Sequence, residues 1–187
     1  MAISSDDGFR KSKYIIMEFE VENIAVTYDR ENNGKVSDIS LEIEVKRQKK
    51  DGTTQKSKVF IDGKFKRDAR GVVEGWGSGF RIKEFVLACV PGLKFGVDDL
   101  GRIADEVWDK CKGKTFHLLK YISLKDDGTE TYRNYTNFAA DAPGLEKKFF
   151  KDVENDRIYK YEPSLATDAD TSFPFPEVED GKEDMVI

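Results

Sequence analysis

The chain has 187 residues, of which 39% are hydrophobic and 36% charged, and a formal net charge of −5 at pH 7. This length and the 13 Phe favour one domain with an apolar core and an appendage. No apolar run reaches the roughly 20 residues of a membrane helix, the N-terminal residues lack the apolar stretch of a signal peptide, and two cysteines are too few for a disulfide scaffold or a zinc site. We therefore expect a cytoplasmic protein with buried thiols, no membrane association and no metal or other cofactor.

A long first strand is expected after residues 1–12, which are polar and predicted to form a flexible N-terminus. Its apolar residues alternate in one phase over residues 15–21 and in the opposite phase over residues 24–28. One face of a strand repeats every two residues, so the change of phase predicts a bulge or bend near Glu22 and Asn23. The two sets are Ile15, Met17, Phe19 and Val21, then Ile24, Val26 and Tyr28.

Two further strands are predicted on either side of a hairpin turn. Apolar and polar residues alternate over residues 39–45, which indicates a half-buried strand. The Asp-Gly pair at 51–52 suits the positive φ of a tight turn, and residues 56–66 return as the third strand. The two faces of that strand hold Val59 and Ile61 on one side, and Lys58 and Phe60 on the other.

The middle of the chain predicts a loop and a helix. Residues 71–80 are rich in glycine and indicate a loop, whereas residues 85–93 fit neither a helix nor a strand clearly. A helix is predicted over residues 97–111, because its apolar residues recur at helical spacing and Gly113 follows its end. The apolar stripe consists of Leu100, Ile103, Ala104, Val107, Trp108 and Cys111.

Two more strands and a short helix complete the pattern. The strands are expected over residues 115–124 and 131–138, joined by a hairpin turn, and the helix over residues 143–152. Three strands, a helix and two strands is the order of an OB-fold, whose first strand pairs on both sides of the barrel and is therefore bent. We predict a mainly β, OB-fold-like five-stranded Greek-key barrel with one or two helices over residues 13–163. Other small α+β barrels share this order.

Charge is segregated along the chain. Residues 46–70 contain ten Lys or Arg against three Asp, a balance of +7, whereas residues 167–187 carry −6 and residues 1–166 carry +1. A basic stretch and an acidic tail predict a polyanionic ligand and a tail that competes for the same surface. The acidic, proline-containing composition predicts that residues 164–187 form a disordered tail that binds proteins. A lysine-rich hairpin that is merely solvated, with a frayed end, is the alternative explanation.

No catalytic or metal-binding pattern is recognisable in the sequence. Lys112–Thr115 ends like a phosphate-binding loop, yet it lacks the earlier glycine and leaves a helix instead of entering one. Gly75–Gly79 lacks the strand–helix unit of a dinucleotide site. His117, the sole histidine, has no cysteine cluster beside it. We therefore expect a protein that is not an enzyme, and a small enzyme with an unrecognised site is the weaker alternative.

Basic and aromatic residues on the predicted strands favour a single-stranded nucleic-acid ligand. Binding of this kind combines a positive groove for phosphates with aromatic rings that stack on bases. On the last strand, Tyr132 and Phe138 are expected to point into the core, which leaves Tyr135 on the opposite face. Trp76 is either a lid over the core, which we favour, or a stacking platform. The predicted contacts are Lys46, Arg47, Lys49, Lys50, Lys56, Lys58, Phe60, Lys64, Lys66, Arg67, Trp76, Tyr121, Arg133, Tyr135 and Asn137.

With these features, the chain resembles the single-stranded-DNA-binding proteins of bacteriophages. The likeness consists of the OB-like element order, the segment Tyr132-Arg133-Asn134-Tyr135 and the acidic terminal segment. It implies a protein that coats and protects single-stranded DNA during phage replication or recombination, in the cytoplasm of an infected bacterium.

The resemblance also implies a role for the tail, which would recruit replication and recombination proteins through its acidic residues and dock through a hydrophobic tip. Bacterial-type tails commonly end in an aromatic residue, whereas Phe173 and Phe175 lie upstream here, so the identity of the partner stays open. The implied contacts are Glu177, Glu179, Asp180, Glu183, Asp184, Met185, Val186 and Ile187.

Other ligands fit the same features. An RNA-binding OB module would use the same basic and aromatic residues, and an adaptor protein would hold an acidic protein partner on its basic hairpin. The sequence leaves these alternatives open, together with the site size, the cooperativity and whether the protein acts as a homodimer.

Overall fold

The computed structural model describes residues 14–32, 35–124, 126–158 and 184–186 of the chain. Most of its ordered elements are strands, and no helix among the described residues is long and apolar enough to cross a membrane. In chain order the elements are β1 (Tyr14–Asn32), β2 (Lys35–Gln48), β3 (Thr54–Gly63), β4 (Lys66–Arg67), β5 (Val73–Gly75), the 3₁₀ turn η1 (Gly77–Gly79), α2 (Phe80–Cys89), α3 (Asp105–Cys111), β6 (Thr115–Leu124), β7 (Glu130–Asn134), α4 (Ala142–Glu154) and β8 (Asp184–Val186).

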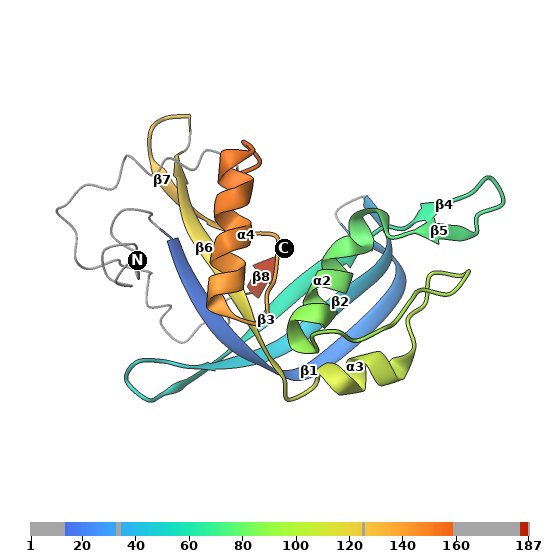
Figure 1. Ribbon diagram of the computed structural model, residues 1–187, viewed down its shortest axis with the longest axis horizontal. Coiled ribbons are helices and arrows are strands. Elements are labelled where there is room, and N and C mark those ends of the chain that lie inside the picture. Colours follow the sequence, from blue (N-terminus) through green and yellow to red (C-terminus); the bar gives the residue numbers. More distant parts are fainter. Residues whose placement is uncertain (1–13, 33–34, 125, 159–183, 187) are drawn as a thin grey trace.

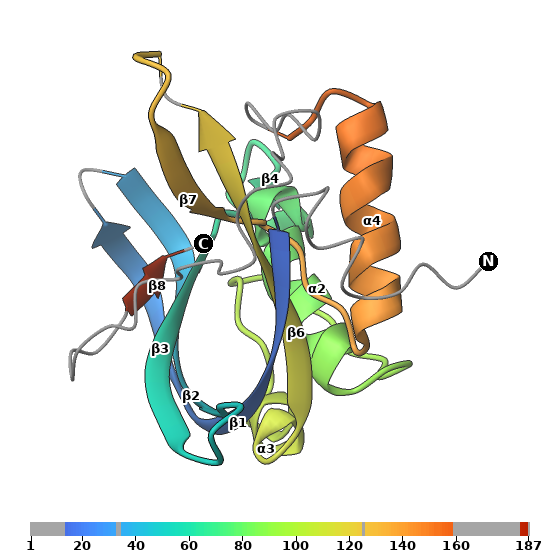
Figure 2. The ribbon, with the colours of Figure 1, turned by 90° about the vertical axis from the view of Figure 1, so that its left-hand side faces the viewer.

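Five antiparallel strands form one curved sheet in the order β7-β6-β1-β2-β3 (Figures 1 and 2). The long strand β1 pairs with β6 along Tyr14–Glu20 and with β2 along Glu20–Asn32, as the first strand of an OB-like fold does. The helices α2 and α3 lie between β3 and β6 in the chain. The mainly β, OB-like architecture is therefore confirmed. The sheet is open, since β3 and β7 do not pair among the described residues.

A bulge changes the side-chain phase of β1, as the sequence predicted near Glu22 and Asn23. The register of β1 against β2 shifts between Val21 and Asn23. The extra residue allows both Val21 and Ile24 to face the core, where their side chains are buried. The bulge therefore lies where β1 passes from its pairing with β6 to its pairing with β2.

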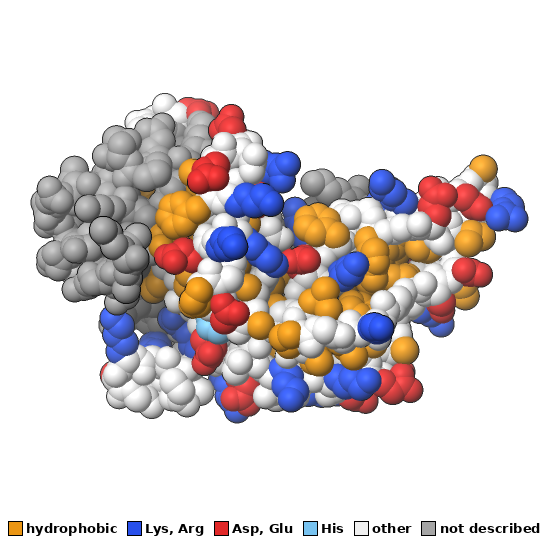
Figure 3. All heavy atoms as spheres, in the orientation of Figure 1, with side chains coloured by type: hydrophobic (Ala, Val, Ile, Leu, Met, Phe, Trp, Pro, Cys, Tyr) orange, Lys and Arg blue, Asp and Glu red, His pale blue; other side chains and the backbone are white. Residues whose placement is uncertain are grey.

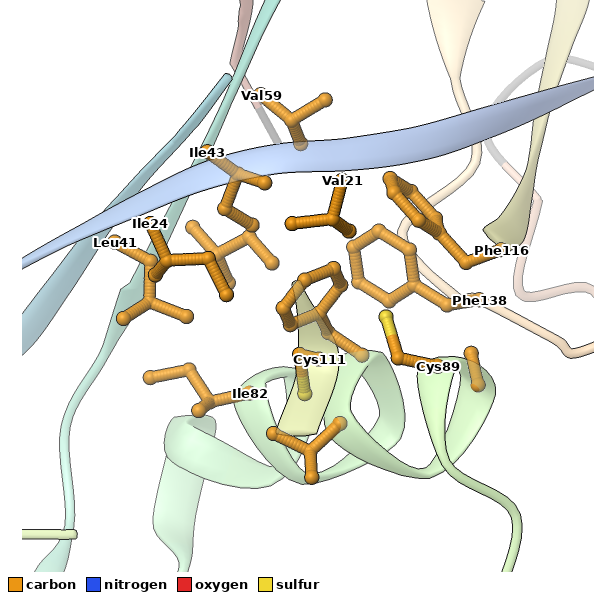
Figure 4. Packing of buried hydrophobic residues seen from close by; sticks show 14 of the residues in the cluster. Val21, Ile24, Leu41, Ile43, Val59, Ile82, Cys89, Cys111, Phe116 and Phe138 are labelled. Carbon is orange, nitrogen blue, oxygen red and sulfur yellow. The ribbon is translucent and has the colours of Figure 1, made fainter. Parts of the chain in front are cut away.

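The inner face of the sheet packs against α2 and α3 to form the main core (Figure 4). The ring centroid of Phe116 lies 5.2 Å from that of Phe85 and 5.9 Å from that of Phe138, both in edge-to-face geometry. Such contacts stabilise the fold beyond the removal of apolar surface from water. Other members of this core are Val21, Ile24, Leu41, Ile43 and Val59 from the strands, and Ile82, Cys89 and Cys111 from the helices.

A second apolar cluster lies on the other face of the sheet, beneath α4. The helix predicted over residues 143–152 is confirmed as α4, and Asp141 caps it by accepting a hydrogen bond from the Gly144 N–H at 2.7 Å. This helix covers one face of β6, which a ligand therefore cannot reach. The cluster consists of Tyr14, Leu119, Tyr121, Tyr135, Ala139, Leu145 and Phe149.

Two predicted elements are shorter in the structure. The helix predicted over residues 97–111 begins only at Asp105. Asp98 instead accepts hydrogen bonds from the N–H groups of Leu100 and Arg102, both at 2.9 Å, and closes a turn that leaves Leu100 72% exposed. The last predicted strand ends at Asn134. Of residues 85–93, which the sequence left unassigned, residues 85–89 form the second half of α2 and residues 90–93 follow its end.

The C-terminal residues that the structure describes form a strand that the sequence did not predict. Asp184–Val186, the strand β8, pairs in parallel with Lys58–Phe60 on β3. The prediction of a flexible segment at residues 1–12 lies outside the described residues. So does the predicted disordered tail, residues 164–187, apart from Asp184–Val186.

Candidate nucleic-acid interface

The basic stretch over residues 46–70 is partly neutralised by carboxylates on neighbouring strands. Lys46 Nζ lies 3.0 Å from Glu20 of β1, and this hydrogen bond raises the pKa of Lys46. Two more ion pairs join Lys56 to Glu22 and Lys58 to Glu42. The balance of +7 overstates the local charge, because the antiparallel register brings carboxylates of β1 and β2 beside the lysines.

Two arginines of this stretch are held by the protein itself. Arg67 Nη2 lies 2.8 Å from Asp38 Oδ1, and Arg67 Nη1 donates to the carbonyl of Gly71 at 2.9 Å. Arg47 Nε donates to Gln55 Oε1 at 2.8 Å. These bonds fix the loop after β3 and the β2–β3 hairpin, so the geometry gives both arginines a structural role.

The β2–β3 hairpin separates the remaining basic residues from Phe60. Lys49 and Lys50 are exposed in the turn before Gly52, whose φ of +83° confirms the predicted turn. Phe60 is half-buried, and β8 pairs alongside it. The ion-paired part of β3 lies between the turn and Phe60, so this hairpin does not bring exposed lysines and an open ring together.

The tyrosines predicted to stack on bases are buried, and this part of the prediction is wrong. Tyr121 and Tyr135 are only 6% and 3% exposed, and their ring centroids lie 5.6 and 5.3 Å from that of Phe149 in α4. The Tyr135 hydroxyl donates to Asp152 Oδ2 at 2.6 Å, and Asn137 Nδ2 donates to the Tyr135 hydroxyl at 2.9 Å. Burial and the bond to Asp152 raise the pKa of Tyr135.

The predicted last strand covers these residues only in part, because β7 ends at Asn134. Tyr132, expected in the core, is 39% exposed, whereas Phe138 is buried as expected. Arg133 is exposed, but its Nε donates to Ser123 Oγ at 2.8 Å. Arg133 and Asn137 are thus held by hydrogen bonds within the protein. The residues predicted to form a binding site on the last strand therefore have structural roles.

Aromatic rings and exposed lysines meet elsewhere, where β5 and η1 lead into α2. The half-buried Trp76 ring lies 5.8 Å from Phe65 and 5.6 Å from Phe95 between centroids, and Phe80 is 43% exposed. Lys83 Nζ lies 5.9 Å from the centroid of Trp76. Figure 3 shows hydrophobic and basic side chains interleaved over α2 and the loop after it. We name this set the Trp76 surface: Lys64, Lys66, Trp76, Phe80, Lys83, Lys94 and Phe95.

Backbone contacts hold the segments of the Trp76 surface together. The Gly79 N–H donates to the carbonyl of Lys64 at 3.2 Å, and the Lys64 N–H donates to Ser78 Oγ at 2.9 Å. Gly77 has a φ of +49°, and a Cβ atom there would lie 2.3 Å from the Lys64 carbonyl oxygen. Only glycine therefore allows η1 to approach the end of β3 this closely.

The lysines of the Trp76 surface are open to solvent. Lys64, Lys66, Lys83 and Lys94 are all exposed, and none forms an ion pair with another residue of the described ranges. Lys66 pairs with Gly75, directly before Trp76. The surface thus combines cations that can contact phosphates with rings that can stack on bases, as single-strand binding requires.

Part of the Trp76 surface was missed by the sequence reasoning. It named Lys64, Lys66 and Trp76 as contacts, but not Phe80 or Lys83. Trp76 is neither a fully buried lid nor an open platform, because one part of its ring packs on the core and the rest is accessible. The signal in the sequence was the pair of aromatic residues around a glycine-rich turn, but the lysines beside them are assembled only by folding.

The cysteines and the histidine interact with other residues of the fold. Cys89 and Cys111 are free thiols buried in the main core, as expected (Figure 4). The hydrogen bond with Cys111, and then burial, raises the pKa of Cys89, so this thiol stays protonated at neutral pH. His117 Nε2 lies 3.5 Å from Glu18. No group of three His, Cys, Asp or Glu residues in the described ranges could hold a metal ion.

Comparison of the chain with models of known protein families and with curated proteins finds no match. The likeness to phage single-stranded-DNA-binding proteins therefore remains a prediction from the sequence, and the geometry of the Trp76 surface has to support a function by itself.

Proposed function

We propose that the protein binds single-stranded DNA through the Trp76 surface, with little sequence preference and without enzymatic activity. The supporting observation is that Lys83 lies over the ring of Trp76, where η1 leads into α2 and the exposed Lys66 pairs beside Gly75. The lysines would contact phosphates, and the rings would stack on bases at about 1–3 kcal/mol per base. Bound along a strand, the protein would coat and protect it.

The biological setting belongs to the proposal as well. Phage replication or recombination in an infected bacterium, and recruitment of its proteins by the acidic tail, are supported by the sequence resemblance alone. The OB-like fold agrees with this setting, but a fold hosts many functions, and the site has to decide between them.

A fluorescence-anisotropy titration with a dye-labelled oligo(dT) of roughly 30 nucleotides tests the proposal. The test variant, Lys64→Glu with Lys66→Glu and Lys83→Glu, reverses three charges of the Trp76 surface. Each phosphate contact contributes about −0.7 to the slope of log K against log salt. The variant should therefore bind more weakly, with a slope that is flatter by about 2.

The matched control makes the same charge change elsewhere. Lys110, Lys147 and Lys151 are exposed on α3 and α4, and their replacement by Glu should reduce affinity much less than the test variant does. Equal losses in the two triple variants would show that only the overall charge matters. Unchanged binding in a folded test variant would remove the Trp76 surface from the proposal.

RNA is the main alternative ligand, because stacking and phosphate contacts serve both nucleic acids. Competition of poly(dT) and poly(U) against the labelled oligonucleotide separates the two. The adaptor alternative has lost support, since Lys46, Lys56 and Lys58 of the basic hairpin already have carboxylate partners.

A further inference from the structure

One edge of the sheet is occupied by the chain's own C-terminal residues. The strand β8 adds to β3 in parallel, whereas the other five strands of the sheet are antiparallel (Figure 2). The edge of β3 thus accepts an extended peptide as an added strand. The register places Asp184 opposite Lys58, Met185 opposite Val59 and Val186 opposite Phe60.

This edge has more room than β8 uses. β3 has ten residues, Thr54–Gly63, and β8 pairs with three of them. No other strand of the described ranges lies on that side of β3. An edge strand offers its backbone N–H and C=O groups to any extended segment that fits. The edge is therefore a docking site, and the short strand β8 occupies it through only a few backbone hydrogen bonds.

The register of β8 on β3 suits the C-terminal strand. Asp184 stands opposite Lys58, and Val186 stands opposite the half-buried Phe60. Lys56 and Lys58 already have carboxylate partners in Glu22 and Glu42, so the occupant is favoured by backbone pairing and register and not by free charge.

We propose that the C-terminal strand of a second copy occupies the edge of β3, so that the protein self-associates by exchanging β8. Every copy carries the same edge and the same strand, so exchange replaces each contact by an identical one. No tight turn ties β8 to its own β3, because residues 64–183 separate the two strands in the chain. This inference does not depend on a nucleic-acid ligand.

Cross-linking of two different full-length variants tests the exchange. One copy, lengthened by a purification tag, carries Lys58→Cys, and the other carries Asp184→Cys. Paired positions on neighbouring strands are within disulfide reach, so a mild oxidant should produce a heterodimer. Lys58→Cys mixed with Val186→Cys, which is two residues out of register, should cross-link several-fold less. Cys89 and Cys111 are buried, and the unaltered chain gives the background.

The outcomes distinguish β8 paired with β3 of its own copy from β8 paired with β3 of a second copy. A heterodimer from the in-register pair alone supports the exchange. If the double variant Lys58→Cys/Asp184→Cys closes only within one chain and the mixture gives no heterodimer, β8 stays on its own copy and the proposal is overturned. Equal cross-linking of both pairs would overturn it too, because random encounters would then explain the product.

Sedimentation velocity over a range of concentrations gives a second, independent measurement. Met185→Pro removes a backbone donor from the centre of β8 and should weaken self-association several-fold, whereas Met185→Ala should leave it nearly unchanged. The same association constant for the proline variant and the unaltered chain would contradict exchange through β8.

Discussion

Phe80 is the most exposed aromatic residue of the Trp76 surface and is 43% exposed. Phe80→Ala should weaken oligo(dT) binding by about 1–3 kcal/mol, because a stacking partner is lost. The free energy of unfolding should change little, since so open a ring adds little to the core. Anisotropy titration and urea unfolding measure the two quantities.

Leu100→Ala is the matched control for Phe80→Ala. It also shortens an exposed apolar side chain, 72% accessible, outside the Trp76 surface, and it should leave binding unchanged. If both variants lose the same affinity, stacking on Phe80 is not the cause.

Tyr135 should make stability depend on pH in the alkaline range. Its pKa in the folded protein is raised by burial and by the hydrogen bond to Asp152, whereas an unfolded tyrosine has a pKa of about 10. The stabilisation is therefore fully present below about pH 10 and is lost as the pH rises through the folded-state pKa.

Tyr135→Phe tests this linkage. The variant should be less stable at neutral pH, because its hydrogen bonds to Asp152 and Asn137 are gone. Above about pH 10 its stability should fall less steeply than that of the unaltered protein. Urea midpoints between about pH 8 and pH 11 measure both effects, and identical slopes would rule out Tyr135 as the titrating group.

The alternation of apolar and polar residues correctly predicted which face of a strand each side chain occupies, where the strand is regular. Val59 and Ile61 are buried on one face of β3, and Phe60 lies on the other, as expected. The same rule failed for Tyr121 and Tyr135, because α4 packs over their face of the sheet. A contact between segments far apart in sequence has no trace in a local pattern.

At the scale of elements, local signals predicted strands and turns but not their assembly into a site. β6 has the predicted bounds Thr115–Leu124, and the bulge in β1 lies where the phase of its apolar residues changes. The Trp76 surface joins the end of β3, η1, α2 and the loop after α2. Nothing in the order of residues shows that these segments meet.

Substitution of Gly77 tests whether the Trp76 surface depends on the close approach of η1 to the end of β3. Gly77 and Gly71 both have positive φ, +49° and +83°, so alanine at either position is strained by about 1–2 kcal/mol. Only at Gly77 would the added Cβ also collide with the Lys64 carbonyl oxygen, and nothing lies within 4 Å of a Cβ at Gly71.

Gly77→Ala should therefore lower the free energy of unfolding more than Gly71→Ala does. It should also weaken oligo(dT) binding, because Lys64 is displaced from the Trp76 surface, whereas Gly71→Ala should not. Urea unfolding and anisotropy compare the two variants. Equal effects on both quantities would mean that the approach of η1 to β3 is not needed for binding.

For the molecule as a whole, the element order predicted an OB-like fold, but not that the sheet stays open. β7 has only five residues, Glu130–Asn134, and the edge of β3 holds β8 instead. Closure depends on pairing between distant segments, which a sequence pattern cannot report. For the same reason, the sequence suggested more unpaired positive charge over residues 46–70 than the structure has, since the carboxylate partners come from other strands.

The acidic tail is predicted to compete with DNA for the body of the protein. Residues 167–187 carry −6 and residues 1–166 carry +1, and the described end of the tail, Asp184–Val186, contacts the body at β3. Removal of residues 167–187 should therefore tighten oligo(dT) binding. The gain should be larger at about 50 mM than at about 300 mM salt, because salt screens the attraction between tail and body.

Met185→Pro in the full-length chain separates the charge of the tail from the pairing of β8. It keeps every acidic residue but disturbs the strand. If competition is electrostatic, this variant should bind oligo(dT) as the unaltered chain does, while the truncated chain binds more tightly. A gain equal to that of truncation would instead show that strand pairing at β3 holds the tail against the DNA site. Weaker binding after truncation, or the same change at both salt concentrations, would refute competition, because the tail would then be part of the site or have no influence on it.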